Sequence, residues 1–159
     1  MWTLIRALTY ATFFFGVLLV LVPASVLSIA GVPSPPAIGI PQVIGVVLVL
    51  VSATLVISCN LAFVFIGKGT QAEFDAPRRL VIRGPYRFIR NPMYVGVIGV
   101  LAGVTVYYGS AALSIYAIAF WIGMHCRVIF YEEPSLIRSF GNEYERYCIR
   151  VGRWLPRQR

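Results

Sequence analysis

Long apolar runs, separated by short polar segments, dominate the chain. The runs lie at residues 4–30, 43–66, 93–108 and 111–131. A helix needs about 20 apolar residues to cross about 30 Å of hydrocarbon, so the first, second and fourth runs predict membrane-spanning helices. The third run is short for a full crossing. Gly109 and Ser110 separate the last two runs by a tight turn, which predicts a helical hairpin.

The first run has an alternative interpretation. Pro23 lies inside it and predicts a kink. The Pro-Ala-Ser sequence that begins there resembles the small-residue cleavage site of a signal peptide. The run is much longer than the usual apolar core of about 7–15 residues, so a helix that is retained is the stronger prediction.

The basic residues predict the orientation in the membrane. They gather in the connection at residues 68–90 and in the tail that begins at Pro134, whereas the loop at residues 31–42 is uncharged. The positive-inside rule then predicts that the connection, the tail and both termini are cytoplasmic. The net charge of +8 is a possible sign of nucleic-acid binding, but these charges adjoin apolar runs and little soluble mass remains to form a groove. We therefore expect no nucleic-acid partner.

Composition supports a membrane protein. The chain is 58% hydrophobic and 13% charged with a mean hydropathy of +0.78, while soluble domains carry about 25% charged residues. We expect an all-α integral membrane protein with four transmembrane helices, a C-terminal helical hairpin and an interfacial C-terminal helix. Residues 1–66 form an N-terminal two-helix region and residues 67–159 the core. Three widely spaced cysteines lack metal-ligand spacing, so no metal site is predicted.

The segment at residues 140–156 is amphipathic and too polar to span a membrane. Asn142 is a candidate helix cap. An i, i+3, i+4, i+7 pattern predicts one apolar face, and three arginines take the other faces: Tyr144, Tyr147, Cys148 and Val151, against Arg146, Arg150 and Arg153. Two interpretations stay open, an interfacial helix with arginines toward lipid phosphates and a lid over a site.

The motif RNPMYVG at residues 90–96 opens the third apolar run. Asn91 is a good helix cap and Pro92 suits the first helical position. A helix N-terminus offers free N–H groups that favour an anion. Tyr94 and Gly96 lie in the first turns, where Gly96 leaves room for a ligand or for another backbone. Ordinary interfacial aromatic residues and helix packing are the alternative.

A second cluster of ionisable residues closes the fourth run. His125 and Glu132 are seven positions apart, on one helical face, and Glu133 follows at the end of the helix. Ionisable groups in membrane helices usually face a cavity or each other. The hairpin brings this end beside Asn91 and Pro92, so the two ends suit a zwitterionic ligand. A salt bridge between the glutamates and the arginines of the preceding loop is the alternative.

Together, RNPMYVG, the glutamate pair and the tail resemble the membrane methyltransferase superfamily that includes isoprenylcysteine carboxyl methyltransferases and phospholipid N-methyltransferases. Its signature is R-H-P-x-Y-x-G followed by two glutamates, and the resemblance covers about residues 67–156. It implies S-adenosylmethionine as the cofactor. It also implies a set of cofactor-binding residues: Arg90, Asn91, Pro92, Tyr94, Gly96, His125, Glu132 and Glu133. Asn91 replaces the histidine of the signature, so a proton-transfer role there is not expected.

We therefore expect a methyltransferase whose acceptor is lipophilic, at the cytoplasmic side of a multi-pass membrane protein. A carboxylate acceptor needs a cation to position it, for which Arg87, Arg90 and Arg146 are candidates. An amine acceptor must lose a proton, and His125 or Glu132 is then the candidate base. A non-enzymatic membrane subunit or lipid-binding module is the alternative, which explains the helices but not the paired motifs.

Overall fold

The computed structural model describes residues 9, 13, 15–35, 37–67 and 79–157. Within these residues the regular secondary structure is helical, and the contact between Ile89 and Gly152 is an isolated bridge. The all-α prediction is therefore confirmed. The first eight residues and the part of the basic connection at residues 68–78 lie outside the described residues.

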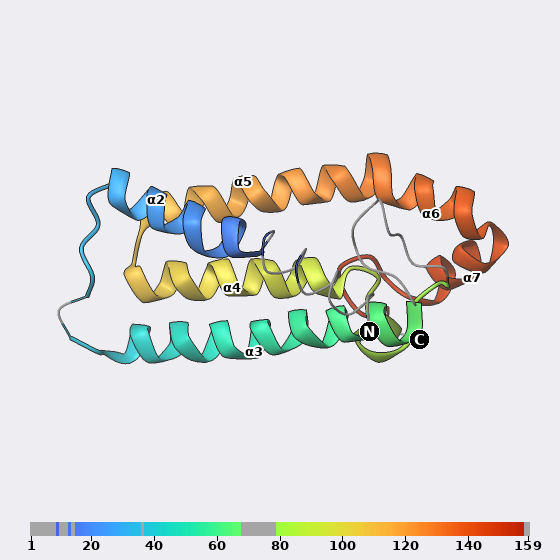
Figure 1. Cartoon of the computed structure of the whole chain (residues 1–159), viewed down its shortest axis with the longest axis horizontal. Helices are drawn as coiled ribbons and strands as arrows, with labels where there is room; N and C mark the ends of the chain where they lie inside the picture. Colours follow the sequence, from blue (N-terminus) through green and yellow to red (C-terminus); the bar gives the residue numbers. More distant parts are fainter. Residues whose placement is uncertain (1–8, 10–12, 14, 36, 68–78, 158–159) are drawn as a thin grey trace.

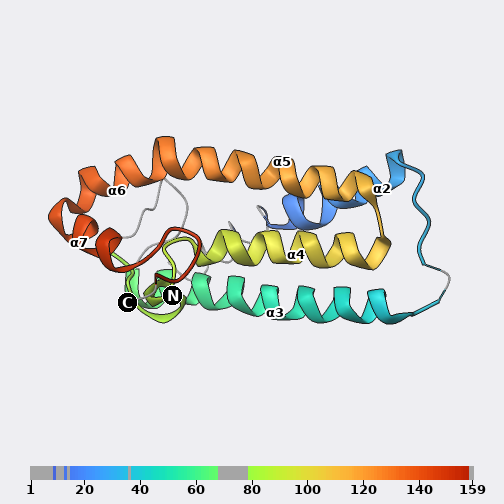
Figure 2. The same ribbon diagram turned by 180° about the vertical axis from the view of Figure 1, so that it is seen from behind.

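Three long helices lie side by side in both views of the ribbon (Figures 1 and 2). Helix α4 (Pro92–Tyr108) lies between α3 (Ile40–Ala62) and α5 (Ala111–Arg127), and α2 (Val22–Ile29) packs against α5. Helices α6 (Glu133–Phe140) and α7 (Asn142–Arg150) lie together at the end of the bundle where α4 begins. Most of the residues expected to bind the cofactor meet at this end.

Two helical stretches are long and apolar enough to cross a membrane. They are Ile40–Gly67, which is α3 with the π-helical turn η2 (Phe63–Gly67), and Ala111–Phe140. Val17–Ile29 and Pro92–Tyr108 are shorter apolar helices. Large apolar side chains stay exposed along much of α3, as expected for a surface that faces lipid. The structure thus supports two of the four predicted spans by length, and the other two stay a prediction.

Small residues let α3 and α4 pack closely. A Cβ atom added to Gly103 would lie 2.7 Å from the carbonyl oxygen of Gly45, and one added to Gly96 would lie 2.7 Å from Cγ2 of Val56. Ser52 fills the corresponding space beside Gly99. Close backbone approach through small residues is the usual way for helices to associate in lipid, where no hydrophobic driving force brings them together.

The fourth apolar run continues further than the sequence predicted. Helix α5 passes into the π-helical turn η5 (Val128–Glu132) and then directly into α6, so one helix of 30 residues reaches Phe140. The prediction that it ends at the glutamate pair was wrong. Pro134 cannot donate a backbone hydrogen bond, and the wider π turn just before it accommodates this loss without ending the helix.

The predicted turn at Gly109 and Ser110 is present, whereas the predicted cap at Asn142 is replaced. Gly109 adopts a left-handed conformation (φ 60°) and Ser110 caps α5 by accepting a hydrogen bond from the N–H of Leu113. At the start of α7 the capping residue is Gly141 (φ 50°) and not Asn142, which is already helical. The positive φ of Gly141 is the reason, because glycine adopts this conformation with no steric cost and turns the chain sharply between α6 and α7.

Candidate active site

The two ends of the hairpin meet through a direct hydrogen bond. The hydroxyl of Tyr94, in the first turn of α4, donates to Oε1 of Glu132 at the end of η5. Nε of Arg127 donates to the same oxygen at 3.0 Å. Arg127 and Glu132 are five residues apart, a spacing that a π turn brings onto one face. The same turn shifts the register, so the expected common face of His125 and Glu132 is lost.

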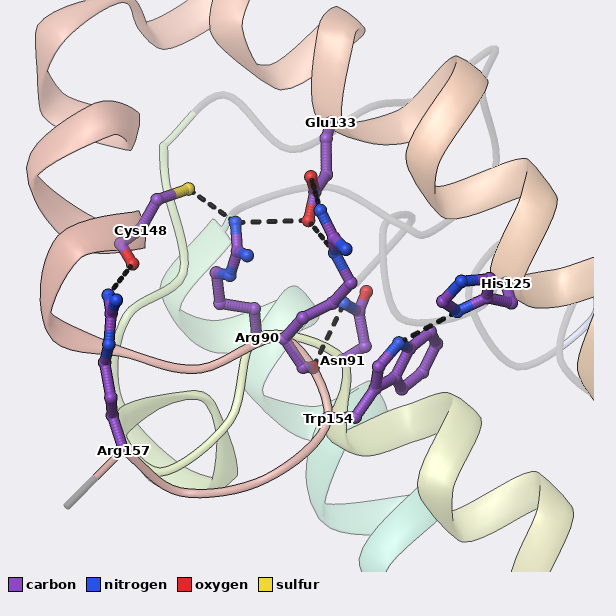
Figure 3. Close-up of polar contacts among 8 residues, drawn as sticks. Arg90, Asn91, His125, Glu133, Cys148, Trp154 and Arg157 are labelled. Atoms are coloured by element: carbon purple, nitrogen blue, oxygen red, sulfur yellow. Dashed lines mark hydrogen bonds and ion pairs between the residues drawn. The ribbon is translucent and has the colours of Figure 1, made fainter.

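Glu133 lies in an ion triad rather than facing open space. Nε and Nη2 of Arg153 donate to its two carboxylate oxygens at 2.8 and 2.7 Å, and Nη1 of Arg90 lies 3.1 Å from Oε1 (Figure 3). This bidentate geometry is the strong form of an arginine–carboxylate pair. It also raises the pKa of Arg153, because the carboxylate stabilises the charged guanidinium. The sequence left open a salt bridge between the glutamates and an arginine of the loop, and Glu133 forms such a bridge with Arg90. A second arginine, Arg153 from the tail, also takes part.

One of the hydrogen-bond donors of Arg90 has no partner among the described residues. Its Nη1 also donates to the sulfur of Cys148 at 2.6 Å. Its Nε is buried and has no hydrogen-bond partner among the described residues. A buried donor without a partner is costly, so such an atom beside a cavity is a candidate contact for a bound ligand.

The tail segment 151–154 ties the start of α4 to the rest of the site. The backbone N–H of Arg90 donates to the carbonyl oxygen of Gly152 at 2.8 Å. Nδ2 of Asn91 donates to the carbonyl oxygen of Arg153 at 3.3 Å. Asn91 stands at the predicted capping position of α4, but its side chain makes no capping hydrogen bond. The predicted side-chain cap is therefore absent, and the hydrogen bond of Nδ2 orients the side chain toward the tail.

His125 belongs to an aromatic stack and is not among the residues that line the cavity. Nε1 of Trp154 donates to its Nδ1 at 3.1 Å, and the rings of Trp121 and Trp154 lie 5.0 and 5.8 Å from its ring (Figure 3 shows His125 and Trp154). The contact joins α5 to the tail. His125 is therefore placed to hold the tail in position, and its expected role in the pocket stays a prediction.

A cavity of about 270 Å³ opens between these elements. Charged and amide groups line one part of it, and aromatic and apolar side chains line the rest: Arg90, Asn91, Arg127, Glu132 and Glu133, with Tyr94, Tyr86, Tyr131, Tyr144, Tyr147, Phe63 and Phe140 among the aromatic residues. Ligand sites in proteins share this mixture of an apolar lining with a few convergent polar groups. The cavity therefore has the character of a site for an organic ligand with charged ends.

Helix α7 covers the cavity. Tyr144 and Tyr147, from its predicted apolar face, are buried and line the cavity wall. The hydroxyl of Tyr147 donates to the carbonyl oxygen of Tyr86 at 2.6 Å. Burial raises the pKa of Tyr147, so this hydroxyl stays protonated and keeps its hydrogen bond. Of the two interpretations of this segment, the buried tyrosines favour the lid.

The other predicted residues divide between the cavity and its surroundings. Pro92 is the first residue of α4, as predicted, and its side chain is buried. Gly96 faces Val56 and Ser52 of α3, so its close approach is to a helix and it does not line the cavity. Arg87 and Arg146 line a separate groove on the outside.

Sequence reasoning missed several residues of the site. The sequence pattern puts Arg153 on an outer face of the C-terminal helix, although α7 ends at Arg150 and the chain then turns. No feature of the sequence pattern singles out Trp154. The partners of these two residues lie 20 and 29 positions away along the chain, so no local periodicity indicates them. Tyr144 and Tyr147 carried a signal in their apolar spacing.

Comparison with known proteins identifies the family of this chain. The sequence pattern of the phospholipid methyltransferase family matches residues 40–143, which include α3, the hairpin and the start of α7. A search of curated proteins and a search of solved structures found no match. The family match covers well over half of the chain and includes Tyr94, Glu132 and Glu133. The chain therefore belongs to the phospholipid methyltransferase family, within the wider group of membrane methyltransferases that also contains the isoprenylcysteine carboxyl methyltransferases.

Proposed function

We propose that this protein transfers a methyl group from S-adenosylmethionine to a lipophilic acceptor at the cytoplasmic face of a membrane. One observation supports the proposal most directly. The first turn of α4 and the glutamate pair, which the resemblance assigns to cofactor binding, meet at one cavity through the bond between Tyr94 and Glu132. A membrane anchor or an assembly subunit does not require this convergence.

The residues of the cavity fit the proposed cofactor. S-adenosylmethionine carries a carboxylate, an ammonium, a sulfonium and a flat adenine ring. Arg90, with its unpartnered buried Nε, would hold the carboxylate, and Glu132 would hold a positive group. Tyr144 and Tyr147 offer apolar walls for a ring. Glu133 would act less directly, because Arg90 and Arg153 already neutralise it.

The protein's contribution to the reaction would be alignment and exclusion of water. The cofactor supplies a methyl group that is already activated by the positive sulfur. Tyr94 and Glu132 would fix the position of the reacting groups, and α7 would close the cavity against solvent. No strong nucleophile of the protein is needed, which agrees with a cavity lined by arginines, carboxylates and tyrosines.

Two acceptor classes remain open, a carboxylate and a lipid amine. A carboxylate would be positioned by Arg127, which lines the cavity, rather than by Arg87 or Arg146, which lie outside it. An amine would lose its proton to Glu132 rather than to His125, because Glu132 lines the cavity and Nδ1 of His125 accepts a hydrogen bond from Trp154. In both cases the acceptor would enter sideways from the bilayer.

The proposal is tested by cofactor binding. Purified protein in detergent should bind S-adenosylhomocysteine, and Glu132→Gln should weaken this binding about ten- to a hundred-fold, because a hydrogen bond to a charged group contributes about 1.5–3 kcal/mol. Labelled S-adenosylmethionine with a membrane lipid extract would then identify the acceptor. Absence of binding by folded protein would favour a non-enzymatic lipid-binding module. Unchanged affinity in Glu132→Gln would give that residue a structural role only.

A further inference from the structure

A second concave surface lies on the outside of the site, behind the lid. It is formed by the segment before α4 and by α7 with the residues that follow it. Tyr147 lines both this groove and the cavity, so the two spaces adjoin at this residue. We call this surface the arginine groove, and its main residues are Arg87, Arg146, Arg150, Arg157, Phe88 and Ile149.

The charge of the groove is strongly positive. Four arginines line it against one glutamate, Glu143. Some of these arginines also make contacts within the protein. Nη1 of Arg157 donates to the carbonyl oxygen of Ile149 at 2.7 Å, and the guanidinium of Arg87 lies over the ring of Phe88 at 4.7 Å. None of the four is paired with a carboxylate among the described residues, so the positive charge of the groove is not neutralised within the part of the chain that the structure describes.

Large apolar side chains are exposed beside these charges. Ile149 is 69% exposed and Phe88 is 55% exposed. Leu155, which follows in the tail, is 77% exposed. In water, the exposure of several large apolar side chains on so small a surface would be unfavourable. Next to a bilayer they enter the headgroup region while the arginines remain with the phosphates.

The position of the groove fits the boundary of the bilayer. Helix α7, which lines the groove, lies at the end of the bundle where α4 begins, next to the candidate spans (Figure 1). The helix Ala111–Phe140 is about 45 Å long at 1.5 Å per residue, longer than about 30 Å of hydrocarbon, so its end at this side reaches the headgroup layer.

We propose that the arginine groove binds the phosphate of an anionic phospholipid in the membrane that surrounds the protein. The arginines bind the phosphate, and Phe88 and Ile149 contact the upper part of the acyl chains. The exposed aliphatic side chain of Ile149 beside the arginines favours a lipid, because one surface then contacts both the phosphate and the acyl chains, whereas a nucleic acid would stack on aromatic rings. This site is separate from the cavity, so it does not depend on methyl transfer.

Native mass spectrometry of the detergent-solubilised protein, without methyl donor, provides the test. Short-chain phosphatidylglycerol should bind at least tenfold more tightly than short-chain phosphatidylcholine. Arg150→Gln should reduce the affinity for phosphatidylglycerol about fivefold, and Arg146→Gln combined with Arg150→Gln on the order of thirtyfold, since each arginine near an anionic surface contributes about 1 kcal/mol. Arg138→Gln, which removes an exposed arginine of α6 outside the groove, is the matched control and should stay within about twofold.

Arg150 is the safest single change, because its side chain makes no hydrogen bond or ion pair with the rest of the described chain. The proposal is overturned if Arg150→Gln and Arg138→Gln bind the lipid equally, or if phosphatidylcholine binds as tightly as phosphatidylglycerol. A stronger preference of the same groove for an oligonucleotide than for lipid also overturns it. Glu132→Gln should leave phosphatidylglycerol binding unchanged, which distinguishes this surface from the cavity.

Discussion

At the scale of single residues, the two adjacent glutamates have different surroundings. Glu132 lines the cavity and accepts a hydrogen bond from Tyr94 and another from Arg127. The side chain of Glu133 is only 14% exposed and is held by Arg90 and Arg153. The sequence predicted that both glutamates bind the cofactor, whereas the geometry favours direct ligand contact by Glu132 only. Glu132 is placed to meet a ligand, and Glu133 to hold together the loop, the helix and the tail.

Glu133→Gln should therefore destabilise the protein. The change leaves Arg90 and Arg153 close together with no carboxylate between them, and breaking a buried pair in this way costs about 3 kcal/mol. Thermal unfolding in detergent should show a clearly lower midpoint. Glu143→Gln, at an exposed site on α7, is the control and should change little. A wild-type midpoint for Glu133→Gln would mean that the triad contributes nothing to the fold.

The contact between Trp154 and His125 gives a second prediction at this scale. Trp154→Phe keeps a ring in the stack and removes only the hydrogen bond to Nδ1, so it should cost about 1 kcal/mol. Trp154→Ala also removes the ring and should cost more. If the tail positions the site, both variants should lower the affinity for S-adenosylhomocysteine, and Trp154→Ala should lower it more than Trp154→Phe. If both variants keep the wild-type affinity for S-adenosylhomocysteine while their stability is lowered, the stack has a structural role only.

At the scale of helices, the packing of α3 on α4 determines where the cavity lies. Gly96, Gly99 and Gly103 form the seam on α4, and their neighbours on α3 leave no space for a Cβ atom. The seam fixes α4 along its length, so it also fixes Tyr94 at its start. Gly96 thus influences the site through packing, without contacting the cavity.

Gly103→Ala should separate the two helices. Its new methyl group would lie 2.7 Å from the backbone oxygen of Gly45 and 2.9 Å from the backbone nitrogen of Val49, and neither atom can move aside alone. Overpacking of this kind costs about 1–3 kcal/mol. Gly123→Ala is the matched control, because nothing lies within 4 Å of its added Cβ and alanine favours the helix. If thermal unfolding shows equal midpoints for both variants, the seam does not limit stability.

At the scale of the whole molecule, a surrounding membrane explains why so much apolar surface is exposed. Exposed aliphatic side chains cover much of α3 and α5, while the charged side chains of the site gather at the end that carries α6 and α7. In water this surface would drive aggregation, and in a bilayer it faces lipid. The site then lies at the boundary between hydrocarbon and water, where the proposed lipophilic acceptor and water-soluble cofactor could both reach it.

Cysteine labelling in intact cells or sealed vesicles tests this placement. With the exposed Cys126 replaced by serine, a cysteine at Ser34, in the uncharged loop, should react with an impermeant reagent from the outer side. A cysteine at Ser139, at the end of α6, should react only after the membrane is permeabilised. Reaction of both positions from the same side would contradict the four-span arrangement.

The sequence determined the elements and most of the chemistry. The second and third apolar runs predicted helices close to their observed limits, and the glycine and serine at residues 109 and 110 predicted the hairpin. The arginine, tyrosine and glutamate residues predicted a polar end of the bundle. These features follow from local rules, since hydrophobic periodicity, proline and glycine act on the chain within a few residues.

Only the tertiary structure decided which side chains meet. The π turn before Pro134 moved Glu132 away from the face of His125 and toward Tyr94. The tail contacts two residues of the hairpin by hydrogen bonds, Glu133 through Arg153 and His125 through Trp154. Such contacts join residues 20 to 38 positions apart, and they depend on helix register and on the path of the chain after α7. A periodic pattern gives the face of each helix, but the partner of that face depends on how the helices pack.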